Sequence, residues 1–214
     1  MIGDKLLIND YHRQAAKTIY NRVKPLLEQS TNPVAVTVAG ESGSGKSETA
    51  AVLAALCESA GYQPQILQQD DYFILPPKSN HQKRLTDLDW VGPGEVKLDL
   101  IEEQVGQIKL KKLSSLTKPL VNYELNMITD ETIKIDNIKI VIIEGTYTTL
   151  IKNADLRAFI DRTYRQTKKA RLARSRDPLT AFLEKVLAIE HRIISAHKSK
   201  ADLIIAAPQD DLLS

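Results

Sequence analysis

Hydrophobic residues recur along the chain with two kinds of spacing, and each predicts a different kind of element. Residues 9–29 carry apolar side chains at helical intervals, so they are predicted to form an amphipathic helix that begins at Asn9 or Asp10. Its apolar face packs either on the core of the same chain or against a second copy in a homo-oligomer. Shorter apolar runs predict β-strands at 34–39, 64–69, 139–143, 158–161 and 201–206.

Predicted helices alternate with these strands. They cover 47–56 with an end near residue 61, 99–112, a basic stretch from about 166 to 176, and a long stretch around 182–194. This alternation is typical of α/β folds in which helices cover both faces of a mostly parallel sheet. No repeat, low-complexity segment or linker divides the sequence. We therefore expect residues 1–214 to form one doubly wound α/β domain.

Two segments interrupt the alternation. Residues 74–97 contain five Pro and Gly residues, which predicts a loop, and a loop of this length in a compact domain is usually functional. Residues 121–135 are rich in β-forming residues and are predicted to form a hairpin with Asp130 and Glu131 at its centre.

Composition and charge narrow the class of protein without assigning a function. The 214 residues include 29 basic and 27 acidic side chains, a net charge of +2, which gives no support for nucleic-acid or membrane binding. No signal peptide is visible, and no apolar run approaches the ~20 residues of a membrane helix. The single cysteine, Cys57, cannot form an internal disulfide, so we expect a cytoplasmic protein with a buried thiol.

The most informative segment is residues 40–47, which match the phosphate-binding pattern G-x-x-x-x-G-K-[S/T] between a predicted strand and a predicted helix. Its glycines let successive backbone N–H groups face an anion. Lys46 can reach the outer phosphates, and the Ser47 hydroxyl can contact Mg²⁺. The residues expected to hold ATP or another nucleoside triphosphate are Gly40, Ser42, Gly43, Ser44, Gly45, Lys46 and Ser47.

Acidic residues follow two predicted strands, at the sheet edge where ligands of open α/β folds bind. Glu144 follows the 139–143 strand, and Mg²⁺ is its expected partner, with a salt bridge or helix cap as the alternative. Asp70 is expected to be the general base for a substrate hydroxyl and to lie within reach of the metal. Because adjacent residues at a strand end point in opposite directions, Asp71 could be the general base instead of Asp70. Asp71 is also expected to contact the substrate.

Basic residues gather between positions 162 and 176. Arg171 and Arg174 are three positions apart and share a helix face, while Arg176 lies elsewhere. Because arginine suits the clamping of phosphates during phosphoryl transfer, we expect a lid over about 165–178 that closes over ATP and supplies these side chains. The alternative is a solvated basic face.

Three aromatic residues near the acidic strand end are open to two interpretations. Tyr72 and Phe73 directly follow the aspartates, and Trp90 lies in the loop rich in Pro and Gly. Each could line a substrate pocket or pack in the core.

Together these motifs resemble those of the uridine kinase and phosphoribulokinase-like branch of P-loop kinases, in the same order over residues 33–206. The family patterns G-x-S-G-S-G-K-S, Q-D-[DS]-[FY]-[FY] and [VI]-[FVI]-E-G match residues 40–47, 69–73 and 142–145. An R-x-x-R-x-R-D-like lid matches residues 171–177, and a late A-D-[LV]-I-I strand matches residues 201–205. The resemblance implies a P-loop kinase fold with an arginine-bearing lid.

Carried over position by position, the resemblance makes Asp70 the catalytic base and makes Ser47 and Glu144 contacts of Mg²⁺. It puts Arg171, Arg174 and Arg176 near the phosphates and Tyr72, Phe73 and Tyr123 near the acceptor. The acceptor half departs from uridine kinases at two places. Residues 88–93 stand where the family has an F-D-H-P-D-like stretch, and no histidine follows Tyr123 in the predicted hairpin.

We expect an ATP- and Mg²⁺-dependent kinase that phosphorylates a hydroxyl of a small molecule, with uridine or cytidine as the leading acceptor. Nicotinamide riboside, pantothenate and a sugar phosphate are alternatives within the same reaction class. The alternative from another class is a regulatory protein that hydrolyses ATP without a small acceptor. The phosphate loop grips phosphates rather than the base, so it leaves the identity of the donor nucleotide open.

Overall fold

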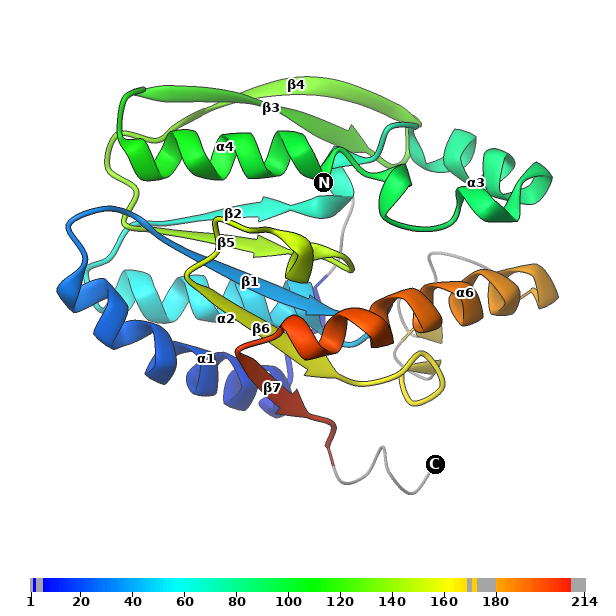
Figure 1. The fold of residues 1–214 in the computed structure, drawn as a ribbon, viewed down its shortest axis with the longest axis horizontal. Helices are drawn as coiled ribbons and strands as arrows, with labels where there is room; N and C mark the ends of the chain where they lie inside the picture. Colours follow the sequence, from blue (N-terminus) through cyan, green and yellow to red (C-terminus); the bar gives the residue numbers. More distant parts are fainter. Residues whose placement is uncertain (1, 3–5, 169–170, 173–179, 209–214) are drawn as a thin grey trace.

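A five-stranded parallel sheet forms the centre of the computed structural model, which describes residues 2, 6–168, 171–172 and 180–208 (Figure 1). Its strand order is β2-β5-β1-β6-β7. The strands are β1 (Val34–Gly40), β2 (Pro64–Gln68), β5 (Ile140–Glu144), β6 (Leu156–Asp161) and β7 (Leu203–Ala206). Because later strands are added on both sides of β1, the sheet is doubly wound, as the sequence predicts.

Helices cover both faces of the sheet. The longer ones are α1 (Asp10–Gln29), α2 (Lys46–Ser59), α3 (Pro77–Thr86), α4 (Leu98–Leu110) and α6 (Ala181–His197). Short 3₁₀ turns are η1 (Gln69–Tyr72), η2 (Leu88–Trp90), η3 (Pro93–Glu95), η4 (Thr148–Leu150) and η5 (Lys198–Lys200). A separate antiparallel hairpin joins β3 (Ser115–Asn122) to β4 (Met127–Lys134).

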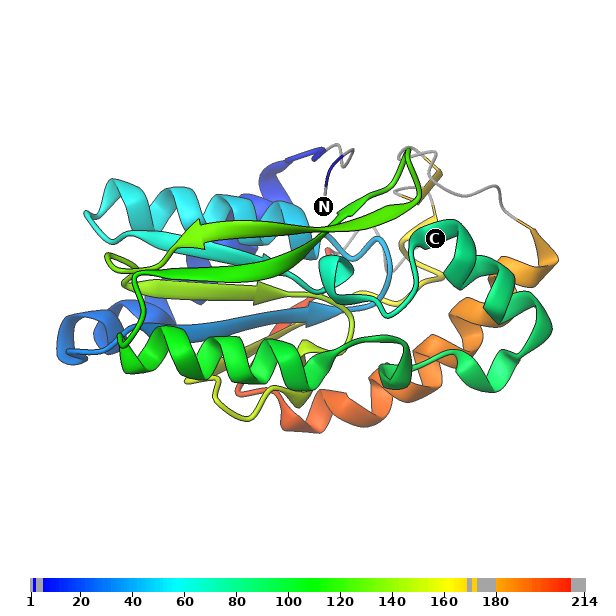
Figure 2. The same cartoon turned by 90° about the horizontal axis from the view of Figure 1, so that it is seen from above.

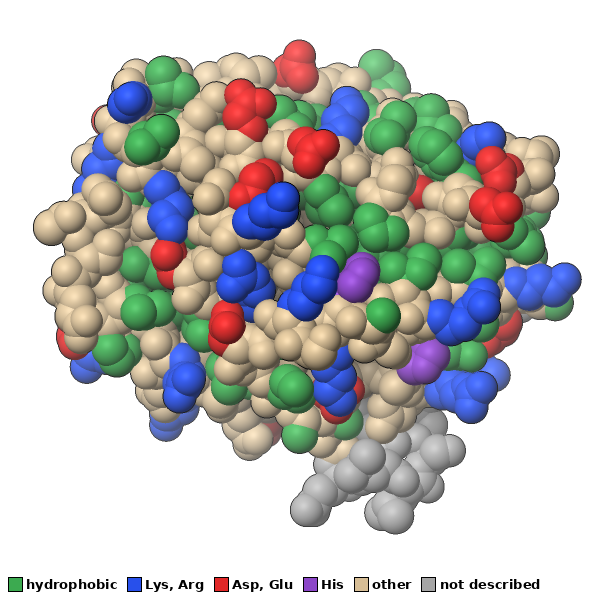
Figure 3. All heavy atoms as spheres, in the orientation of Figure 1, with side chains coloured by type: hydrophobic (Ala, Val, Ile, Leu, Met, Phe, Trp, Pro, Cys, Tyr) green, Lys and Arg blue, Asp and Glu red, His purple; other side chains and the backbone are tan. Residues whose placement is uncertain are grey.

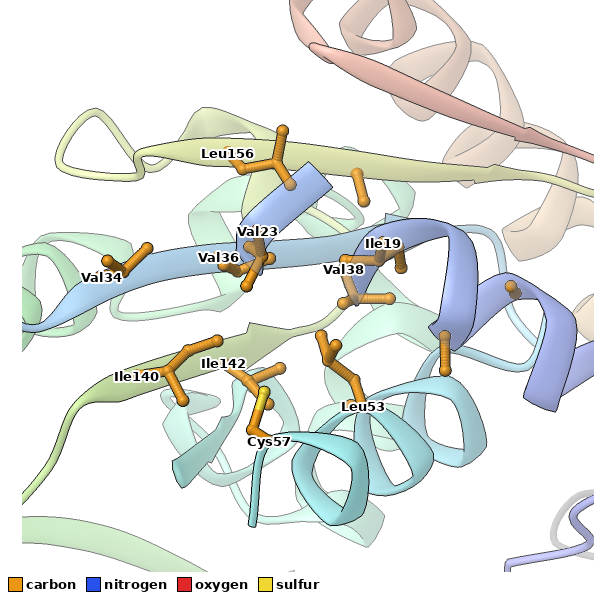
Figure 4. Close-up of a cluster of buried hydrophobic side chains, with 14 of the residues drawn as sticks. Ile19, Val23, Val34, Val36, Val38, Leu53, Cys57, Ile140, Ile142 and Leu156 are labelled. Atoms are coloured by element: carbon orange, nitrogen blue, oxygen red, sulfur yellow. The ribbon is translucent and has the colours of Figure 1, made fainter. Parts of the chain in front are cut away.

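One face of the sheet packs on α1 and α2 (Figure 4). Alternate residues of the strands point to this side, among them Val36 and Ile142, which are fully buried. Ile19 of α1 and Leu53 of α2 meet them there. Each fully buried side chain of this size contributes about 1.5–3 kcal/mol, so this layer anchors the helix that follows the phosphate loop.

The opposite face packs on α4, on the β3–β4 hairpin and on part of α6 (Figures 1 and 2). Val141 and Ile143 point to this side and meet Ile101 of α4 and Ile194 of α6. The carboxyl ends of the central strands lie between α3 and α6, so residues that follow the strands reach one common region (Figure 1).

Local signals in the sequence account for most of these elements. Asn9 caps α1 by accepting a hydrogen bond from the backbone N–H of His12, and the His12 ring accepts one from the backbone N–H of Asn9. The predicted strands and the helices around α2, α4 and α6 are confirmed within a few residues. The basic stretch predicted from about 166 to 176 lies largely outside the described residues.

Two expectations are wrong. Residues 74–97 are not a loop throughout, because α3 begins at Pro77 and runs for ten residues. Proline is well tolerated in the first turn of a helix, so the Pro-Pro pair marks the start of this helix. The hairpin does not turn at Asp130 and Glu131, which lie within β4; the turn falls between Asn122 and Met127.

None of the helices among the described residues combines the length with the hydropathy that crossing a membrane requires.

Candidate active site

The phosphate loop connects β1 to α2, and three of its glycines, Gly40, Gly43 and Gly45, have positive φ. Gly43 has φ 75° and Gly45 has φ 96°, a region that other residues rarely adopt. A Cβ atom on Gly43 would come within 2.6 Å of the Arg171 side chain, and one on Gly45 within 2.5 Å of the His12 ring. The loop is therefore closely enclosed on both sides. Helix α2 begins at Lys46, so its N-terminus faces the concave side of the loop.

Side chains from the segment after β6 brace the loop from outside. The Thr167 hydroxyl donates to the Ser42 carbonyl at 2.8 Å, and Arg162 donates to the Ser44 carbonyl at 3.3 Å. Glu41 is buried; its carboxylate accepts the backbone N–H of Tyr164 at 2.6 Å and lies 2.7 Å from Nδ1 of His191. These contacts connect the phosphate loop to the segment after β6 and to α6.

Arg171 lies beside this loop. Its Nη2 donates to the Tyr164 carbonyl at 2.8 Å, while its Nε and Nη1 are buried without a hydrogen-bond partner in the part of the chain that the structure describes. Unsatisfied buried donors are rare and costly, and a phosphate is the acceptor that such a guanidinium binds best. Arg171 therefore fits a nucleotide at this loop. The other predicted lid arginines, Arg174 and Arg176, lie outside the described residues.

Glu144 stands at the end of β5, directly beside the first turn of α2. The Ser47 hydroxyl donates to its carboxylate at 3.1 Å, and Gln68 donates to the same oxygen at 3.3 Å. Burial raises the pKa of Glu144 to about 7, the charge of Asp70 adds to this rise, and Lys46 opposes it. Lys46 also donates to the Glu41 carbonyl at 2.9 Å.

This arrangement fits Mg²⁺. Two carboxylates, on Glu144 and Asp70, repel one another in a buried setting, and a hydroxyl oxygen adjoins one of them. A divalent cation would relieve the repulsion and would receive the hard oxygen ligands that Mg²⁺ prefers. Among the described residues no group of three or more potential ligands forms a closed metal cage. The donor set therefore suits a cation that is shared with phosphate oxygens.

The two neighbouring aspartates have different surroundings. Asp70 lines a cavity that also contains Lys46, Ser47 and Glu144. Asp71 is 1% exposed, lies 2.9 Å from Nζ of Lys118 and accepts the backbone N–H of Val121 at 3.0 Å. Asp71 thus ties η1 to the hairpin, and the structure does not bring it to the cavity.

The cavity has a volume of about 680 Å³ and extends from the phosphate loop into the space between α3 and α6. Hydrophobic side chains are exposed on the face between these helices (Figure 3). The apolar and aromatic lining residues are Phe73, Leu75, Pro77, Leu85, Val121, Tyr123, Phe182, Leu183 and Val186. Polar lining residues beyond the phosphate loop include Asp70, Lys78, Asn80, His81, Arg84 and Glu190. The volume and mixed lining are typical of a small-molecule site.

The aromatic candidates separate into two groups. Phe73 and Tyr123 line the cavity. Tyr72 is fully buried and donates its hydroxyl hydrogen to Gln104 at 2.6 Å, so it belongs to the core. Trp90 does not line the cavity; its indole N–H donates to the Asn80 side chain at 2.8 Å, and Asn80 does line it.

A cluster of charged residues that the motifs did not reveal includes two that line the cavity, Arg84 and Glu190. Arg84 of α3 donates two hydrogen bonds to Glu95 and a third, of 3.1 Å, to Glu190 of α6. Burial raises the pKa of Glu190, and the charges of Arg84 and Lys46 act in the opposite direction. The sequence held one signal for Glu190, since it lies four residues after Val186 and four before Ile194 on the apolar face of a helix.

The sequence and the fold both match known kinases. Residues 35–211 match the family model described as the phosphoribulokinase / uridine kinase family. A uridine kinase of Ureaplasma urealyticum is 31% identical over 135 residues, which cover 61% of this chain and 63% of that protein. The match thus spans less than two thirds of the length of that relative.

Two further similarities cover more of the chain. A uridine kinase of Latilactobacillus sakei is 26% identical over 192 residues, 84% of this chain and 88% of that protein. The solved structure of a possible uridine kinase from Bacillus stearothermophilus has a TM-score of 0.61 at 16% identity and covers 90% of this chain and 98% of its own. At this identity the structural similarity shows a shared fold.

Proposed function

The chain belongs to the phosphoribulokinase / uridine kinase family, and from this premise we propose that it transfers a phosphoryl group from ATP to a hydroxyl of a small acceptor. One observation carries the proposal: the phosphate loop and Asp70 line the same cavity as the apolar surfaces of α3 and α6. A donor phosphate and an acceptor hydroxyl could therefore meet in one enclosed space, which is what phosphoryl transfer requires.

Different side chains of the cavity would bind the phosphates, bind the metal and accept the proton. ATP supplies the phosphoryl group and Mg²⁺ lowers the charge on its phosphates when they are bound. Lys46, the loop amides and Arg171 would hold the phosphates, and Ser47 with Glu144 would hold the metal. Asp70 would orient the acceptor hydroxyl and accept its proton, because its carboxylate lines the cavity beside the phosphate loop. Asp71 is occupied by Lys118 and Val121, which supports Asp70 as the base.

A neutral nucleoside, with uridine or cytidine first, fits the acceptor half of the cavity best. Phe73, Tyr123 and Phe182 offer flat apolar surfaces for a base. Arg84 is paired with two carboxylates, so it offers little net charge to an acceptor phosphate or carboxylate. Nicotinamide riboside is a further candidate on the same grounds, whereas a sugar phosphate or pantothenate is disfavoured. We also propose a cytoplasmic setting, which suits the buried unpaired thiol of Cys57.

The proposal is tested by measuring ADP release from Mg²⁺–ATP against uridine, cytidine, nicotinamide riboside, pantothenate and several sugar phosphates. Stimulation by uridine or cytidine would support the nucleoside kinase, and stimulation by another compound would replace the acceptor while keeping the reaction. The Lys46→Ala variant serves as the inactive background. ATP hydrolysis that no acceptor stimulates would contradict the proposal and favour a regulatory ATPase.

A further inference from the structure

The unexplained feature of the cavity is a carboxylate in a position where packing favours an apolar side chain. Helix α6 points Val186 and Ile194 into the protein, and both are at most 2% exposed. Glu190 lies between them on the same face and lines the cavity. A carboxylate on such a face is destabilising unless it is paired or serves a ligand.

An ion pair with Arg84 does not account for Glu190, because Glu95 already balances the charge of Arg84. Glu95 is fully buried and its two oxygens accept hydrogen bonds from Arg84, from the Asn80 side chain at 2.6 Å and from the backbone N–H of Gly92 at 2.8 Å. This carboxylate is saturated and balances the one positive charge of Arg84. Glu190 adds a second carboxylate to the same guanidinium at 3.1 Å.

The cluster keeps one acceptor and one donor unused. Glu190 Oε2 and Arg84 Nη1 have no hydrogen-bond partner among the described residues, and neither atom is fully buried. Both side chains line the cavity. A carboxylate oxygen next to a guanidinium N–H can accept a hydrogen bond from one hydroxyl and donate one to the oxygen of its neighbour.

We propose that Glu190 and Arg84 form a specificity-determining pair that binds two adjacent hydroxyl groups of the acceptor. The two side chains come from different helices, α6 and α3, so the pair exists only in the folded cavity. Trp90 and Asn80 hold the pair in place through the chain of hydrogen bonds that leads from the indole N–H to Glu95. The pair would thereby select a polyol such as a ribonucleoside over its deoxy analogues.

Other ligand charges match this pair less well. A phosphate or carboxylate on the acceptor would approach Glu190, where two carboxylates already share one guanidinium. An ammonium group would be attracted by Glu190 but repelled by Arg84. A neutral diol satisfies both atoms without a net charge.

The inference rests on the proposed kinase function for its substrate, but binding tests it separately from transfer. Binding of uridine, cytidine and nicotinamide riboside, and of 2′-deoxyuridine and 3′-deoxyuridine, is measured by calorimetry on the protein with Mg²⁺ and a non-hydrolysable ATP analogue. We expect at least one ribonucleoside of this panel to bind. The ribonucleoside that binds should do so about tenfold more tightly than its deoxy analogues, because the loss of one hydrogen bond to a charged group weakens binding by about that factor.

The Glu190→Gln variant should lose this discrimination, while Glu184→Gln, on the same helix but outside the cavity lining, should retain it. In turnover, Glu190→Gln should raise KM for the acceptor about tenfold and leave KM for ATP and kcat within about twofold. A thermal melt of both variants checks that they fold. Equal binding of ribo- and deoxynucleosides by the wild type, or undiminished discrimination in Glu190→Gln, would overturn the pair.

The two hypotheses fail in different ways. Hydroxyl-dependent binding without acceptor-stimulated ADP release would keep the pair and reject the kinase. Acceptor-stimulated release without hydroxyl-dependent binding would keep the kinase and reject the pair. Absence of ribonucleoside binding across the panel would reject the pair as well.

Discussion

The hydroxyl of Ser47 donates a 3.1 Å hydrogen bond to the buried carboxylate of Glu144, which ties the first turn of α2 to the end of β5. This contact joins the segment that holds phosphates to the strand end that carries the acidic group. It also places a carboxylate with a raised pKa at the centre of the site. The pH dependence of the protein should therefore report on Glu144.

Stability should fall as pH rises towards neutrality, and Glu144 should cause part of this fall. In the folded protein the pKa of Glu144 is raised from 4.5 to about 7, so between these values the folded state binds more protons than the unfolded state. The stabilisation from the protonated form is complete below pH 4.5 and is lost as pH approaches 7. The difference amounts to about 3 kcal/mol.

Denaturant unfolding of the nucleotide-free protein from pH 4.5 to 7.5 measures this effect. The Glu144→Gln variant should show a flatter profile by about that amount, because its side chain does not titrate. Glu124→Gln, which changes an exposed carboxylate in the hairpin turn, should follow the wild type. Parallel profiles for wild type and Glu144→Gln would show that the carboxylate is not perturbed.

Replacing the two adjacent aspartates should separate catalysis from stability. Asp70→Asn should lower kcat by on the order of 10² or more with little change in melting temperature, because its side chain faces the cavity. Asp71→Asn should cost about 3 kcal/mol of stability, because it breaks a buried ion pair with Lys118. Steady-state ADP release and thermal melting on the same samples measure both effects. The reverse pattern would assign the base to Asp71.

Two parts of the site differ in how well the sequence predicts them. The phosphate loop, Asp70 and Glu144 belong to short contiguous patterns next to buried strands, so local rules suffice to place them. Glu190 and Arg84 are 106 positions apart and meet only because α3 and α6 face one cavity. No local pattern carries that information.

Local signals also misled where one residue type serves two purposes. Pro77 fits both a loop and the first turn of a helix, and only the packed structure shows α3. Asp130 and Glu131 suggest a turn, yet they lie in a strand, where Glu131 pairs with Lys118 at 3.0 Å. The turn instead uses Asn126, whose φ is 52°, a conformation that asparagine tolerates better than most residues.

Alanine substitutions at two glycines should distinguish backbone strain from steric exclusion. Gly45 and Gly61 both have positive φ, 96° and 82°, but a Cβ on Gly61 would meet open space, whereas one on Gly45 would meet the His12 ring at 2.5 Å. Gly61→Ala should therefore cost about 1 kcal/mol and leave nucleotide binding intact. Gly45→Ala should displace the phosphate loop and abolish binding.

Calorimetry with a non-hydrolysable ATP analogue and denaturant unfolding of both variants measure these effects. A double variant, Gly45→Ala with His12→Ala, provides the control for the clash. If contact with the ring is the cause, the double variant should recover part of the stability lost in Gly45→Ala. Equal losses in Gly45→Ala and Gly61→Ala would attribute the effect to φ alone.

Arg171 should contribute to ATP binding more than its exposed neighbours do. Its Nε and Nη1 are buried beside Gly43 without a hydrogen-bond partner in the described part of the chain, so a bound phosphate would satisfy donors that the protein alone does not. Arg171→Ala should raise KM for ATP about tenfold or lower kcat by a similar factor. The stability of Arg171→Ala should be unchanged or higher, since a buried unsatisfied cation is removed.

Arg165→Ala, on an exposed side chain of the same segment, is the matched control and should behave like the wild type. If both variants leave the ATP titration unchanged, the basic segment is a solvated surface and Arg171 has no part in the reaction.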